Sequence, residues 1–121
     1  MAQEEIAPQI DPATEACVMA FIDLIHERKL AGKPVLAATH KTIARWLSER
    51  TGLRIIPRHV QVLTQVMEQA NLITIGGGGI GLPNTYASRE DAMGPEQFWN
   101  QVDALLMVWQ HPSRHAMQAD D

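Results

Sequence analysis

The chain has 121 residues, of which 45% are hydrophobic, so it can form one packed domain and is not a disordered low-complexity polypeptide. Its apolar runs are too short to cross a bilayer, and the acidic start at Glu4 and Glu5 is unlike a secretory signal peptide. The single cysteine, Cys17, cannot form an intrachain disulfide, which fits a reducing compartment. We therefore expect a cytoplasmic protein that does not contact a membrane.

Charge is segregated along the chain, although the formal net charge of −4 argues at first against a nucleic-acid partner. From Arg28 to Ile75 there are eight basic and two acidic side chains, a net charge of +6. The remainder holds two basic side chains and twelve acids, a net charge of −10. A basic segment within an acidic chain favours contact with a phosphate backbone, although a solvated helix face can also produce such a run.

The chain is expected to begin with a flexible tail over residues 1–12, which hold two prolines, three acids and little periodic pattern. A helix is predicted over 13–31, because apolar residues recur at helical spacing and Gly32 with Pro34 ends the run. Residues 34–38 are too few for a helix and could form a brief strand that pairs with a later hairpin.

The next two helices are predicted as a pair joined by a tight turn. Thr39 is a suitable N-cap for a helix over 40–50, and Gly52 is a suitable stop. Leu53 is expected to fill the turn. The second helix of the pair begins at Pro57, whose missing N–H costs nothing in a first turn.

A hairpin is predicted after this pair. Asn71 can adopt the left-handed conformation that ends a helix, and residues 72–75 alternate as a strand. Residues 76–79 are four glycines that must turn or flex. Residues 80–88 can return as the second strand, with Pro83 kept off the paired edge.

A last helix is predicted over 95–110, after a polar break at 89–94 and before a flexible tail at 111–121. Its apolar arc is too wide for a terminal helix that touches only its own small domain. Part of the arc should pack on the first helix, and part should meet a second copy of the chain. The expected homodimer contact consists of Phe98, Val102, Leu105, Leu106 and Trp109.

The helix pair and the hairpin contain a set of apolar residues and turn residues in a characteristic order. The residues that set it are Ile43, Ala44, Leu47, Gly52, Val60, Leu63, Met67 and Asn71-Leu72-Ile73. Together, over residues 34–88, they resemble the winged helix superfamily of DNA-binding proteins. The resemblance implies a mainly α fold with a small β-hairpin wing, that is, a winged helix-turn-helix over 13–88 with an additional C-terminal helix.

Five side chains of the third helix are candidates for base contacts, if that helix enters the major groove. Arg58 could pair bidentately with guanine, and Gln61 or Gln65 with adenine. Val62 sits where many relatives place a basic or polar residue, and it can contact a thymine methyl group. His59 could reach a base or a phosphate.

Phosphate contacts are expected from Lys41, Arg45 and Arg54, whose residue types grip the DNA backbone. The alternative for the whole set is an ordinary solvated face. The wing tip differs from the family pattern, because its four glycines stand without the arginine or lysine that often enters the minor groove.

No cofactor, metal or catalytic site is predicted. His111 and His115 have the spacing of a helical metal pair, but Pro112 and the terminal position argue against a fixed site. The GGGGIG segment lacks the lysine and the serine or threonine of a phosphate loop. Cys17 is better explained as a core residue, and Trp46 could be either core or an exposed anchor for a partner.

The function expected from these observations is sequence-specific binding of double-stranded DNA by a dimer, as a transcriptional repressor. The alternative is a winged helix used as a protein-interaction module in a plasmid or phage replication, partition or defence-related nucleoprotein assembly. The acidic overall charge, the sparse wing and the hydrophobic last helix all suit that alternative.

Overall fold

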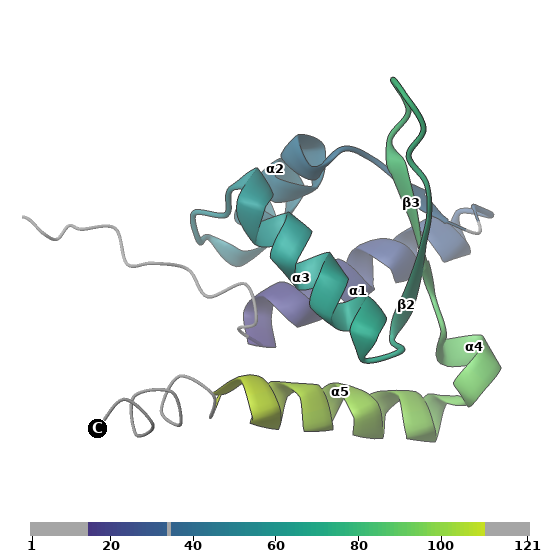
Figure 1. Cartoon of the computed structure of the whole chain (residues 1–121). Coiled ribbons are helices and arrows are strands. Elements are labelled where there is room, and N and C mark those ends of the chain that lie inside the picture. Colours follow the sequence, from purple (N-terminus) through teal and green to yellow (C-terminus); the bar gives the residue numbers. More distant parts are fainter. Residues whose placement is uncertain (1–14, 34, 111–121) are drawn as a thin grey trace, which may run out of the picture.

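The computed structural model describes residues 15–33 and 35–110, with side chains up to residue 107. This part of the chain is mainly helical with a small three-stranded antiparallel sheet, which is compatible with the expected winged helix fold. The tails expected over 1–12 and 111–121 lie outside the described residues. The elements, shown in Figure 1, are α1 (Glu15–Leu30), β1 (Leu36–Ala37), α2 (His40–Thr51), α3 (Pro57–Gln69), β2 (Ile73–Gly77), β3 (Asn84–Ser88), α4 (Glu90–Met93) and α5 (Pro95–Gln110).

The sheet is centred on β3, which pairs with β1 on one side and β2 on the other. Tyr86 is opposite Leu36 in β1 and Ile75 in β2, and its side chain is fully buried. The ring of Phe21 from α1 meets the Tyr86 ring edge-on at 5.5 Å between centroids. The brief strand expected over 34–38 is therefore observed as β1, and α1 packs against the sheet.

The boundaries of α2 follow the predicted caps. The Thr39 hydroxyl accepts a hydrogen bond from the Thr42 N–H at 3.2 Å, which satisfies one of the free donors of the first turn. Gly52 closes the helix with a φ of 72°, a conformation that costs glycine little. Asn71, also at positive φ, follows α3 as predicted.

The turn between α2 and α3 is closed by a serine that sequence reasoning did not single out. The Ser48 hydroxyl accepts a hydrogen bond from the Ile55 N–H at 3.0 Å and donates to the Ala44 carbonyl at 2.8 Å. Ile55 is buried in the core, whereas Leu53, the residue expected to fill the turn, is half-buried against it. Ile55 is thus the main apolar residue of the turn.

Three local predictions about the hairpin and its continuation are wrong. Glycines 76 and 77 belong to β2 and pair with Thr85 and Asn84, because a glycine backbone can form ladder hydrogen bonds like any other. The return strand starts at Asn84 rather than at residue 80, because Pro83 has no N–H to donate. The segment 89–94, expected to be a polar break, contains the one-turn helix α4.

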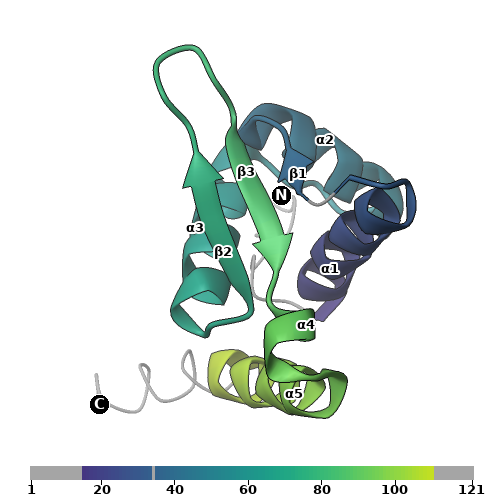
Figure 2. The same ribbon diagram turned by 90° about the vertical axis from the view of Figure 1, so that its right-hand side faces the viewer.

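Helix α5 lies across one end of the helix bundle, beneath α1 and α3 in both views (Figures 1 and 2). Phe98, Val102, Leu105 and Leu106 are at most 8% exposed and belong to the same core as α1, α2, α3 and the sheet. A dimer contact through these four side chains would require α5 to leave its own chain, so that assignment is corrected. The side chain of Trp109, the fifth residue, lies outside the described part.

Removal of the Ser48 hydroxyl is expected to destabilise the fold. Ser48→Ala leaves the Ile55 N–H without its partner and should lower the free energy of unfolding by about 1–2 kcal/mol. Urea denaturation followed by circular dichroism measures this loss. Glu49→Ala, at the neighbouring exposed position of α2, is the control, and an equal midpoint for the two variants would contradict the role of Ser48.

Candidate nucleic-acid interface

Helix α3 has one buried face and one polar face. Val60, Leu63 and Met67 are buried as predicted, and Thr64 is buried beside them at 2% exposure. The Thr64 hydroxyl donates to the Val60 carbonyl at 2.9 Å, so this polar group is satisfied inside the core face. The side chains predicted to contact bases are exposed at Arg58, Gln61 and Gln65 and half-buried at His59 and Val62.

His59 has a second role that sequence reasoning missed. Its Nδ1 atom accepts a hydrogen bond from the Ile56 N–H at 3.2 Å. Ile56 is the residue before α3 and cannot cap the helix with its own side chain, so the histidine closes this end instead. The signal in the sequence is a hydrogen-bonding residue at the third helical position, where a capping residue reaches back. His59 is therefore held at the start of α3 by its ring.

Four cations lie on α2, in the turn that follows it and in the first turn of α3, and they are called here the α2–α3 cations: Lys41, Arg45, Arg54 and Arg58. All four side chains are exposed. Within residues 15–33 and 35–107, none of them forms an ion pair. Two lie one turn apart on α2, one lies in the turn, and one lies in the first turn of α3. Their charge is therefore available to an external anion.

Other cations of the basic segment are used within the fold. Arg50 binds the Glu27 carboxylate through both terminal nitrogens, one at 2.7 Å. This hydrogen bonding holds the pKa of Glu27 below its usual value and raises the pKa of Arg50. The Arg28 guanidinium lies 5.9 Å from the centre of the Trp46 ring, which is half-buried against the core. Trp46, expected either in the core or exposed as an anchor for a partner, is thus partly buried against the core, and its ring faces Arg28 of the same chain.

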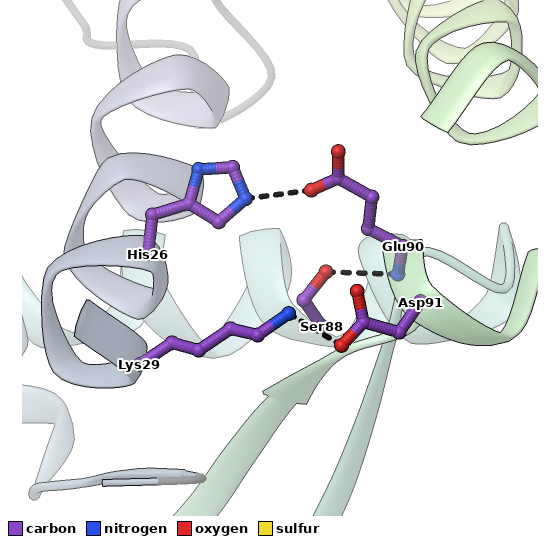
Figure 3. Close-up of polar contacts among 5 residues, drawn as sticks. All are labelled: His26, Lys29, Ser88, Glu90 and Asp91. Carbon is purple, nitrogen blue, oxygen red and sulfur yellow. Dashed lines mark hydrogen bonds and ion pairs between the residues drawn. The ribbon is translucent and has the colours of Figure 1, made fainter. Parts of the chain in front are cut away.

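Two further pairs join α1 to α4 (Figure 3). The His26 Nε2 and Glu90 Oε1 atoms are 2.7 Å apart, and Lys29 contacts the Asp91 carboxylate. The Glu90 N–H donates to the Ser88 hydroxyl at 3.0 Å, which fixes the start of α4. Acids from the C-terminal part of the chain thus neutralise the end of α1 and leave the α2–α3 cations untouched.

A polar groove of about 320 Å³ separates α3 from the hairpin. It is lined by Gln61, Gln65 and Glu68 from α3, His40 from α2, and Ile75 and Asn84 from the hairpin. Two of the predicted base-contacting residues therefore face a concave surface together with the hairpin. Glu68, the single acid of α3, is exposed beside this groove and would repel a phosphate placed there.

The hairpin itself carries no charge. Residues 72–88 contain no acidic or basic side chain, so the basic character of the region comes from α2, α3 and the turn between them. The turn at its tip exposes two aliphatic side chains, Ile80 and Leu82, that sequence reasoning placed in a strand.

Within the described ranges, no group of three or more His, Cys, Asp or Glu side chains is placed to hold a metal ion. His111 and His115, considered for such a site, lie outside those ranges. No helix in the same part of the chain is long and apolar enough to cross a membrane.

Comparison of this chain with protein-family models, curated proteins and solved structures found no match.

Proposed function

We propose that the protein is a winged helix-turn-helix protein that binds double-stranded DNA by placing α3 in the major groove. The observation that carries the proposal is the exposed polar face of α3 beside four cations that form no ion pair within the described residues. An α-helix fits the major groove, and cations on its flanks and supporting helix reach the phosphates. The helix order and the antiparallel hairpin support the winged helix assignment.

The contacts divide by residue type. Arg58, in the first turn of α3, presents a guanidinium that can bind the two acceptors of guanine, and Gln61 and Gln65 can bind adenine. Lys41, Arg45 and Arg54 bind phosphates, which sets the register without reading sequence. The His59 Nδ1 atom accepts the hydrogen bond from the Ile56 N–H, which leaves the Nε2 atom to contact a phosphate or a base.

DNA binding is tested by selecting bound duplexes from a random pool and then titrating the selected duplex against wild type and two variants. Arg58→Ala should cost about 1–3 kcal/mol at the selected site and relax the preference at one base pair. Lys41→Ala should weaken all duplexes alike and reduce the dependence of the dissociation constant on salt. Fluorescence anisotropy at several salt concentrations measures both effects. Absence of duplex binding even in low salt would refute the proposal.

Glu68 gives a test in the opposite direction. Because Glu68 repels phosphates near the groove, Glu68→Gln should strengthen duplex binding by about two- to fivefold, the size of a screened surface charge effect. Glu96→Gln removes the same charge from an exposed position on α5 and is the matched control. Equal affinity changes in the two variants would show that only net charge matters and that the groove does not face DNA.

Dimerisation and repression complete the proposal. A two-fold dimer would present two α3 helices to a symmetric site, and occupation of DNA is sufficient for a repressor. We place the contact on the outer face of α5, where Met107 is 61% exposed, since the inner face is buried in its own chain. The proposed compartment is the cytoplasm.

Light scattering tests the dimer at micromolar concentration. The wild-type protein should have twice the 13.4 kDa mass of the chain, and Met107→Glu should shift it toward the monomer because a buried charge is costly at an interface. A monomeric mass for the wild type would contradict the dimer without affecting the proposal for α3.

The second candidate function is a protein-interaction module within a nucleoprotein assembly. The observation that favours it is the uncharged hairpin, because a neutral surface gains nothing from phosphates. The salt dependence of duplex binding distinguishes the two functions. Binding through phosphates should weaken steeply as the salt concentration rises, whereas a protein-interaction module should show no such steep loss of duplex affinity.

A further inference from the structure

The turn of the β2–β3 hairpin exposes two aliphatic side chains to water. Ile80 has 106% of its reference exposure and Leu82 has 67%. Ile80 stands between Gly79 and Gly81, so no neighbouring side chain covers it. A fully exposed isoleucine at a projecting tip gains free energy from any partner that removes it from water.

The tip has a defined conformation. The Leu82 N–H donates to the Gly79 carbonyl at 2.9 Å, and the Gly78 N–H donates to the Pro83 carbonyl at 3.1 Å. Gly78 has a φ of 79°, and a Cβ placed there would lie 2.1 Å from the Asn84 side-chain oxygen. The turn therefore needs glycine at this position, and it holds Ile80 at the corner of a narrow, hydrogen-bonded loop.

The position of the tip relates it to α3. In Figures 1 and 2 the hairpin projects beyond the helices at the end of the molecule where α3 begins, opposite α5. A duplex that receives α3 in its major groove would continue past this tip. The adjacent minor groove is about 6 Å wide, so it admits a thin glycine-rich loop but not a helix.

The exposed area of the tip is too small for a protein interface of its own. Two side chains on a thin loop fall far short of the roughly 800 Å² that each partner buries in a stable protein interface. If α3 already forms the main interface with the partner, the tip can add a contact without burying an area of that size. The hairpin has no cation for phosphates, which leaves its apolar side chains as its means of contact.

We infer that Ile80 enters the minor groove as an apolar wedge between neighbouring base pairs and bends the duplex bound by α3, with Leu82 behind it. The inference rests on the proposed binding of double-stranded DNA. Insertion of an aliphatic side chain unstacks one base step and kinks DNA toward the major groove. Flexible pyrimidine–purine steps deform most readily, so the site should contain one beneath the tip.

The experiment measures bending and affinity separately on the full chain. The probe is a duplex of about 30 base pairs taken from the selected pool, with a fluorophore at each end. Wild-type protein should raise the energy transfer between the two ends. Ile80→Ser should abolish the rise while binding about tenfold more weakly, because the buried aliphatic contact is lost. Ile80→Leu keeps an aliphatic wedge and should retain the bend.

Leu30→Ser is the matched control, because Leu30 is an aliphatic side chain that is also exposed, at 89%, but lies at the end of α1 and not in the hairpin. It should leave both bend and affinity unchanged. An undiminished bend with Ile80→Ser, or a wild-type complex without any bend, overturns the wedge while leaving DNA binding by α3 intact. A lower mass of Ile80→Ser in light scattering with the bend retained overturns it in favour of a second copy of the chain as the partner. Failure of wild type to bind any duplex overturns both proposals.

Discussion

The hydrogen bond from the Ile55 N–H to the Ser48 hydroxyl is the constraint on which the candidate interface depends. It joins the last turns of α2 to the chain entering α3, and it lets the apolar side chain of Ile55 reach the core without leaving a buried donor unpaired. Arg54 precedes this anchor and Arg58 follows it by three residues, so the positions of both cations relative to α2 are fixed by it. The His59 ring adds a second restraint at the same end of α3. An interface built on a short turn is thus held by side-chain hydrogen bonds as well as by packing.

The fold also decides which positive charges remain for a partner. The sequence shows one continuous basic segment, but ion pairs divide it: Lys29 and Arg50 are matched by Asp91 and Glu27, which come from acidic parts of the chain. These pairs lie at the surface, where water and salt screen them, so each stabilises the fold only weakly. Their larger effect is on the distribution of charge. Of the seven Lys and Arg side chains left outside such pairs in the described part, four lie on α2, the turn and the start of α3. A chain with a net charge of −4 therefore keeps a group of cations there that its own acids do not pair with.

Elements governed by local rules could be predicted from the sequence, and those governed by tertiary contacts could not. The caps at Thr39 and Gly52 and the buried stripe of α3 follow from spacing and side-chain chemistry, and they are observed. The extent of β2 was missed because glycines carry no strand signal, although their backbones pair normally. The sequence shows that α5 has a wide apolar arc, but it does not show which surface covers that arc. The inward-facing part, including Phe98, packs in the core of the same chain, whereas the sequence analysis assigns it to a dimer. Side-chain type indicated the candidate contacts, but only the fold shows that His59 already binds the backbone.

The hairpin and α3 differ in chemistry in a way that suits separate tasks on one ligand. Helix α3 and its neighbours are polar and positively charged, so in the proposed complex they would gain from the phosphates and from the hydrogen-bonding edges of the major groove. The hairpin is uncharged and ends in Ile80, so it gains only from contacts that exclude water. A neutral tip adds little to the rate at which a polyanion is captured, since long-range attraction comes from the cations. In the proposed complex the tip would act after α3 has bound, and the deformability of the DNA beside the major-groove site would determine whether the tip can insert. Sequence preference would then arise at two places in the DNA. Hydrogen bonds to α3 would select bases in the major groove, and the flexibility of a base step would select the sequence at the hairpin.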